Sequence, residues 1–171
     1  RSLAASGRGV LSVAPFAYEP ARDRYEQFYT CYNRTDLACR VQDALTAVAA
    51  LRASGYRRVE LVGTGREAAV AVLAGAWADI DGLAADLGGL DVTSDEAYLE
   101  DLWQPGLRAM GDVRTAALLA AQRCDVQLSG VRGWSAAWAA DHLVTSSASV
   151  AQSQVIEALS AARRHQVTGD K

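Results

Sequence analysis

The sequence predicts an α/β fold: a doubly wound, mainly parallel sheet with helices on both faces. Three observations lead to this expectation. Runs of aliphatic and β-branched residues alternate along the chain with segments whose apolar residues have helical spacing. A pair of glycines stands where one such run meets an alanine-rich helical segment. The chain has 171 residues, 50% apolar and 22% charged, which is enough for one domain with a buried core.

The strands are expected where short apolar runs are bounded by turn residues. Gly9–Pro15 alternates and stops at a proline, so it is predicted to be a short buried strand. Two further runs are bounded by glycines, and two short ones follow near the end of the chain. The remaining predicted strands are Val59–Val62, Ile80–Leu87, Asp125–Val131 and the brief Leu143–Thr145.

The helices are expected where apolar residues recur at three- and four-residue spacing. The clearest begins at Thr35 or Asp36, which can cap it, and ends at Gly55. A second follows the glycine pair and runs to about Asp79. Phe16–Asn33 is predicted to be a loop with room for one helical turn. The remaining predicted helices lie in Asp91–Leu102, Val113–Gln122, Trp134–His142 and Val150–Arg164.

Charge and cysteine content exclude several classes of partner. A net charge of −3 and a pI near 5.4 argue against nucleic acid and against an anionic membrane surface. No apolar run reaches the ~20 residues that span a bilayer. Cys31, Cys39 and Cys124 lack metal-ligand spacing, so we expect buried free thiols and no metal site. A Cys31–Cys39 bridge is the alternative, and it would indicate a soluble, exported protein.

The stretch Val59–Val72 carries the features from which function can be argued. Its sequence, VELVGTGREAAVAV, predicts a strand, a tight turn at Gly63-Thr64-Gly65 and a helix. In α/β proteins, the first free N–H groups of such a helix and the positive end of its dipole face the loop before it. The turn is therefore the first place to look for a site.

Several segments resemble acetyl xylan esterase-like proteins of the α/β-hydrolase superfamily. The resemblance implies that the Val59 strand bears the nucleophile elbow and that Gly9–Pro15 is the strand before it in sequence. The Ile80 strand would then be the next one toward the far edge of the sheet. The segments that carry the resemblance are Tyr32–Leu37, Arg40–Thr46 and Val59–Ala68, with continued similarity at Asp86, Asp95–Leu99 and Pro105–Ala121.

The elbow that the resemblance implies lacks its nucleophile. An elbow has the form Gly-x-Ser-x-Gly, but here Gly65 stands at the serine position and Glu67 at the final glycine position. Thr64 and Glu67 are the weak alternative candidates in the turn. We therefore expect a non-catalytic, carbohydrate-esterase-like domain with a structural or binding role. The alternative is an active ester hydrolase whose reacting groups lie partly in a segment that this chain does not contain.

The other members of a triad are also uncertain in the sequence. The superfamily histidine belongs on the loop before the final helix, but that loop reads Thr145-Ser146-Ser147-Ala148-Ser149. His142 precedes the loop, His165 lies at the far end of the final helix, and both are interpreted as ordinary histidines. Asp86, at the end of its strand, either faces the site or caps the next turn.

The resemblance also implies a partner. In the hydrolase sheet, the strand that carries the oxyanion loop lies between the Gly9 and Val59 strands and comes earlier in the chain. Without that strand, two sheet edges would be left unpaired. We therefore expect residues 1–171 to form a single α/β domain that is the C-terminal part of a larger one. An N-terminal segment or a second chain would complete the sheet, and the chain is also compatible with a homo-oligomer.

A nucleotide site is the rival interpretation of the same turn. Gly63-x-Gly65-x-x-Ala68 fits the dinucleotide pattern, and Asp86 closes the next strand about 20 residues later, where a ribose-binding carboxylate is expected. Against it, Arg66 and Glu67 place bulky charge in the turn, and a strand and a long helix precede it. A glycine pair at such a turn also has a purely structural explanation in close packing and positive φ. Under the hydrolase interpretation no cofactor is expected.

Overall fold

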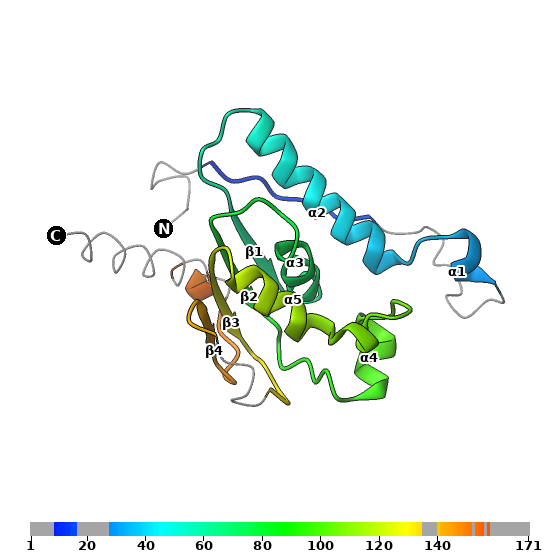
Figure 1. Cartoon of the computed structure of the whole chain (residues 1–171). Helices are drawn as coiled ribbons and strands as arrows, with labels where there is room; N and C mark the ends of the chain where they lie inside the picture. Colours follow the sequence, from blue (N-terminus) through cyan, green and yellow to red (C-terminus); the bar gives the residue numbers. More distant parts are fainter. Residues whose placement is uncertain (1–8, 17–27, 135–139, 152, 156, 158–171) are drawn as a thin grey trace.

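Four parallel strands form the sheet, in the order β1-β2-β3-β4. The computed structural model describes residues 9–16, 28–134, 140–151, 153–155 and 157. Each strand pairs with the next in sequence, so the chain moves across the sheet in one direction (Figure 1). The predicted α/β class with a parallel sheet is confirmed. The strands are β1 (Glu60–Thr64), β2 (Gly82–Asp86), β3 (Asp125–Ser129) and β4 (Leu143–Thr145).

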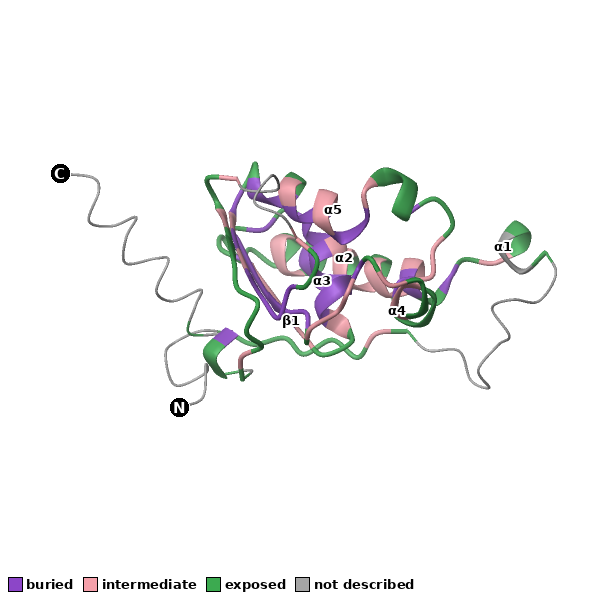
Figure 2. Ribbon diagram, turned by 90° about the horizontal axis from the view of Figure 1, so that it is seen from below, coloured by how far each residue is buried: buried purple, intermediate pink, exposed green. Residues whose placement is uncertain are grey.

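Three helices cover one face of this sheet, as Figure 2 shows. They are α2 (Asp36–Ala53), α3 (Glu67–Gly75) and α5 (Asp112–Ala121). Right-handed crossovers place α3 and α5 on the same side, because the strand order never reverses. On the other face, Val155 in the C-terminal helical residues packs on Ala84, with Val62 and Val150 beside them. Helical residues therefore lie on both faces.

The shorter helices lie in the connections. They are α1 (Tyr29–Tyr32), α4 (Asp95–Asp101) and the 3-10 helix η2 (Arg108–Met110). Both α2 and α4 begin with a side-chain cap: Ala38 N–H donates to Thr35 Oγ1 at 3.1 Å, and Ala97 N–H donates to Ser94 Oγ at 3.3 Å. Figures 1 and 2 both show α1 projecting away from the sheet and helices.

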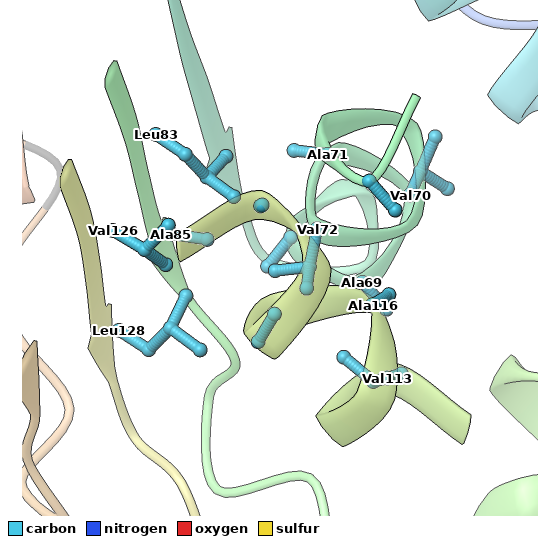
Figure 3. Packing of buried hydrophobic residues seen from close by; sticks show 14 of the residues in the cluster. Ala69, Val70, Ala71, Val72, Leu83, Ala85, Val113, Ala116, Val126 and Leu128 are labelled. Carbon is cyan, nitrogen blue, oxygen red and sulfur yellow. The ribbon is translucent and has the colours of Figure 1, made fainter. Parts of the chain in front are cut away.

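The main core lies between the sheet and the covering helices. Figure 3 shows Leu83, Val126 and Leu128 pointing from the strands toward α3 and α5. α3 is almost entirely buried because its small alanines let it lie close to the sheet and between α2 and α5. Burying a side chain such as Leu83, which is 0% exposed, contributes ~1.5–3 kcal/mol.

The largest departure from the sequence-based expectation is Gly9–Pro15. This segment joins no ladder, and Val10 and Leu11 are 60% and 54% exposed, so the predicted buried strand is wrong. Its end is held on α2, because Phe16 N–H donates to Asp43 Oδ2 at 2.8 Å and Arg40 Nε donates to Phe16 O at 3.2 Å. The alternating residues of this segment favour an extended conformation, but a β-strand also requires a second strand with which it can form hydrogen bonds.

Other boundaries differ by smaller amounts. The helix after the glycine pair ends at Gly75, four residues before the predicted end. Of the predicted Trp134–His142 helix, residues 135–139 lie outside the described residues, while Ala140 bridges to Leu143 and Asp141–His142 form a turn. Most of the predicted final helix also lies outside the described residues, although residues 153–155 and 157 are helical.

The cysteines and the helices bear on two further expectations. All three thiols are free, so the Cys31–Cys39 bridge is not formed; Cys31 is exposed, Cys39 half-buried and Cys124 buried. Burial therefore holds only for Cys124. Among the described residues, no helix combines the length and the hydrophobicity needed to cross a bilayer.

Candidate functional site

The turn between β1 and α3 has the shape of an elbow. Gly65 has φ +60°, a left-handed conformation, and Ala68 N–H donates to Gly65 O at 3.1 Å. Gly63 is needed for packing, since a Cβ there would lie 2.6 Å from Ala71 Cβ and 2.8 Å from Ala68 Cα. A Cβ at Gly65 would meet nothing within 4 Å. The sharp strand-to-helix turn is therefore formed, and the space at its apex holds no side chain.

Two ion pairs connect this turn to neighbouring helices. Arg40 Nη1 of α2 lies 2.8 Å from Glu67 Oε1, and Arg66 Nε lies 3.3 Å from Asp101 Oδ1 of α4. Glu67 Oε2 is buried without a hydrogen-bond partner among the described residues, although the side chain as a whole is 38% exposed. The two charged residues that stood out in the sequence thus hold the turn in place. Thr64, the last residue of β1, pairs in register with Asp86.

Asp86 lies at the carboxyl end of β2, between Thr64 and Ser129 in the sheet register, and is 6% exposed. Its Oδ1 accepts the Gly88 N–H at 2.9 Å. Its Oδ2 accepts the Ser149 hydroxyl at 2.6 Å and the Val150 N–H at 2.8 Å. Both carboxylate oxygens are therefore engaged within the protein.

These contacts set the ionisation of Asp86. Burial raises the pKa of the carboxyl, but the hydrogen bonds from Ser149, Gly88, Val150 and Ser129 together outweigh it and leave the pKa below its ordinary value of 3.8. Asp86 is consequently a carboxylate at neutral pH. It ties the loop after β4 to the end of β2. A ribose hydroxyl would have to share this carboxylate with the protein's own donors.

Gly130 closes the remaining side of Asp86. Its φ is +64°, and a Cβ there would lie 2.5 Å from Asp86 Oδ1 and 2.7 Å from Gly88 N. Gly89 N–H donates to Gly130 O at 2.7 Å, and Gly130 N–H donates to Ala148 O at 3.0 Å. We call Asp86, Gly88, Gly130, Ser149 and Val150 the Asp86 junction. Sequence reasoning identified Asp86 alone, because Gly130, Ser149 and Val150 follow other strands, β3 and β4.

His142 lies at the opposite edge of the sheet. It immediately precedes β4, and its Nδ1 lies 3.0 Å from the Oδ1 of Asp125, the first residue of β3. All four strands run the same way, so this amino edge is separated from the carboxyl edge by the length of a five-residue strand, about 15 Å. The structure therefore does not bring His142 together with Gly65 or Asp86. His165 lies outside the described residues.

An open pocket of about 310 Å³ surrounds His142 at the amino edge. Cys124, which also lines it, is 9% exposed. Burial raises the pKa of the Cys124 thiol to about 11; Arg123 opposes this rise, and Asp125 and Asp81 add to it. The thiol is thus protonated at neutral pH and a poor nucleophile. The other residues lining the pocket are Arg58, Ile80, Asp81, Gln122, Arg123 and Asp125.

No group of three or more His, Cys, Asp or Glu side chains in the part of the chain that the structure describes is arranged to hold an ion. Comparison of the chain with protein-family models, with curated proteins and with solved structures finds no match. The functional argument therefore depends on the site itself.

Proposed function

We propose that this chain is a non-catalytic domain of the α/β-hydrolase, carbohydrate-esterase-like type, with a structural or binding role. The observation that carries the proposal is Gly65. A nucleophile elbow places a serine at the apex of a strand-to-helix turn, and this chain has the turn with a glycine at the apex. A glycine has no atom that can attack an ester.

The positions of the other candidate groups support the same conclusion. A serine nucleophile needs a base within hydrogen-bond reach, about 2.6–3.2 Å. His142 lies at the amino edge, bound to Asp125, and Asp86 is enclosed in its junction. Within the described residues, no hydrogen bond joins Thr64 or Glu67 to His142 or Asp86: Thr64 ends β1, and Glu67 is paired with Arg40.

An ester hydrolysis assay tests the proposal. The full chain and its Gly65→Ser variant are assayed on p-nitrophenyl acetate and on acetylated xylan, with Gly65→Ala as the matched control. Ser and Ala meet the same left-handed φ, so the two variants lose similar stability, roughly 1–2 kcal/mol, and differ only in the hydroxyl. We expect none of the three proteins to exceed the buffer rate. Turnover by the unmodified chain would overturn the proposal.

The Gly65→Ser variant separates two ways of being inactive. If Gly65→Ser restored hydrolysis, a base would have to lie within reach of position 65. The missing serine alone would then explain why the unmodified chain is inactive, and the position of His142 at the other edge would not. If Gly65→Ser stays as inactive as Gly65→Ala while circular dichroism shows both folded, the loss extends beyond the nucleophile.

A further inference from the structure

The pocket at the amino edge collects residues from separate parts of the fold. Its volume of about 310 Å³ is at the lower end of the range of small-molecule sites, ~300–1,000 Å³. The lining comes from the segments just before β1, β2 and β4, from the start of β3 and from the chain after α5. Of the lining residues, Ile80 and Cys124 are apolar and the other six are polar or charged. The pocket therefore suits a small polar ligand.

Arg123 lines the pocket with a positive charge that no carboxylate pairs within the described residues. Its Nη2 donates to Gly75 O at 2.8 Å and to Ala76 O at 2.5 Å, carbonyls at the C-terminal end of α3. These bonds hold the guanidinium in one place, because they satisfy carbonyls that the helix leaves free. In that part of the chain, its Nε and Nη1 have no acceptor. An anion can therefore bind Arg123 without displacing a bond of the protein.

Two further lining side chains have donors to spare. Arg58 Nε donates to Glu60 Oε1 at 3.0 Å, while Arg58 Nη1 and Nη2 donate to no described residue. The amide of Gln122, which is exposed, makes no hydrogen bond with the residues that the structure describes. Together with Arg123, these groups leave several N–H donors of the pocket unpaired. A ligand that supplies oxygen acceptors, such as an oxyanion, fits these donors.

The acceptors in the lining decide which oxyanion fits. Asp81 Oδ2 accepts Arg52 Nη2 and the Val59 N–H, each at 2.8 Å, while its Oδ1 has no partner among the described residues. The His142 Nδ1 faces the carboxylate of Asp125, so the proton is assigned to Nδ1, and the neutral ring presents Nε2 as an acceptor. The two carboxylates repel a doubly charged anion, and the two spare acceptors can receive hydroxyl groups. A monocarboxylate that also carries hydroxyl groups meets both conditions.

We propose that the amino-edge pocket binds a small hydroxylated monocarboxylate, with the carboxylate on Arg123 and hydroxyl groups on Asp81 and His142. This proposal rests on the binding role proposed above and names the chemical class of the ligand. The pocket and the turn at Gly65 lie at opposite edges of the sheet. Ester turnover would therefore overturn the proposed lack of catalysis alone, whereas failed binding would overturn only the assignment of this ligand.

A titration followed by NMR tests the proposal on the full, isotope-labelled chain. The probe is D-glucuronate, and the matched control is D-glucose, which has the same ring with a hydroxymethyl group in place of the carboxylate. We expect glucuronate to shift the Arg123 Nε–H and Gln122 amide signals with saturation at a Kd of about 1 mM, and glucose to leave them unchanged. Equal shifts with both sugars, no saturable shift, or tighter binding of inorganic phosphate would overturn the proposal.

Substitutions then assign the binding to the pocket. Arg123→Gln removes the unpaired charge and should weaken glucuronate binding by about tenfold or more. Arg57→Gln is the matched control, because Arg57 is also exposed at this edge but does not line the pocket, and it should leave the affinity unchanged. Gln122→Ala, which removes no bond made within the described chain, should weaken binding about threefold. Equal weakening by Arg57→Gln and Arg123→Gln would show diffuse attraction and overturn the proposal, as would an unchanged affinity in both lining variants.

Discussion

The carboxyl ends and the amino ends of the strands, which form the carboxyl edge and the amino edge of the sheet, are held in place in different ways. At the carboxyl edge, one buried carboxylate, Asp86, collects backbone and hydroxyl donors from the loops after β2 and β4. At the amino edge, partly exposed ion pairs lie beside the strand starts: Arg52 of α2 with Asp81 at 2.8 Å, and His142 with Asp125 of β3 at 3.0 Å. Buried, charge-assisted bonds contribute more than exposed pairs.

The comparison also bears on function. In parallel sheets, ligands bind at the carboxyl ends of the strands, and that is where a site was expected. Here this edge is filled by the protein's own contacts: Asp86 is enclosed, and Arg66 and Glu67 are tied to α4 and α2. Among the described residues, His142 and a pocket lined by polar side chains lie at the amino edge. The candidate catalytic side chains therefore lie at opposite edges, with Asp86 at the carboxyl edge and His142 at the amino edge.

The largest expected effect is the loss of the Asp86 junction. Asp86→Asn keeps the shape but presents an amide to N–H donors that need an acceptor, so we expect the free energy of unfolding to fall by about 3 kcal/mol. Urea unfolding measures it. Ser149→Ala, which removes one donor and leaves the carboxylate its backbone bonds, should cost about 1 kcal/mol. If Asp86→Asn lowered the free energy of unfolding by less than about 1 kcal/mol, this would contradict the role assigned to the junction.

The direction in which stability changes with pH provides a second test of the Asp86 junction. The pKa of Asp86 is lower in the folded protein than its ordinary value of 3.8. The stability that its ionisation contributes is therefore fully present above that value and is lost as the pH falls through the lower, folded pKa. We expect the unfolding free energy of the parent to fall below about pH 4. Asp86→Asn should fall less steeply over the same range, and parallel curves would refute the assignment.

A pair of glycine substitutions sharpens the description of the turn. Gly63→Ala would force a Cβ to within 2.6 Å of Ala71 Cβ, so α3 must move, at a cost of about 1–3 kcal/mol. Gly65→Ala has open space around its Cβ and is destabilised mainly by the left-handed backbone, by about 1–2 kcal/mol. Thermal unfolding of both proteins should rank Gly63→Ala as the less stable. The reverse order would mean that the close approach of α3 to β1 is not a tight one.

Substitutions at the amino edge should have the smallest effects. Arg52→Ala removes the ion pairs with Asp81 and Asp79 and the hydrogen bonds that Arg52 donates to Asp79 O and Arg57 O. We expect a loss of about 1 kcal/mol, part of it absent at high salt. His142→Gln removes a pair whose side chains are 60% and 28% exposed, and should cost less than about 0.5 kcal/mol. Denaturation at low and high salt distinguishes them. A larger loss for His142→Gln would mean that the ion pairs of the amino edge contribute more to stability than the comparison of the two edges predicts.

The sequence predicted the elements whose signal is local. Helical spacing found α2, and the strand-turn-helix at Gly63 and Gly65 appears as β1, the turn and α3. The predicted strand Gly9–Pro15 is wrong because strand formation depends on a neighbouring strand, which the alternation of residues along the sequence does not reveal. The Asp86 junction could not be predicted for the same reason. Ser149 and Val150 are 63 and 64 residues away in sequence, and the fold alone brings them to the carboxylate.

The central claim is that the turn at Gly65 and the side chain of His142 lie at opposite edges of the sheet. Active-site labelling tests this separation most directly. The full chain and Gly65→Ser are each treated with a fluorophosphonate, which phosphonylates an activated serine, and the intact masses are measured. We expect both masses to stay unchanged, because His142 is bound to Asp125 at the amino ends of the strands, a strand length of about 15 Å from the carboxyl ends, where Gly65 follows β1. A stoichiometric mass increase that maps to position 65 of the Gly65→Ser variant, or to a serine of the unmodified chain, would contradict the account.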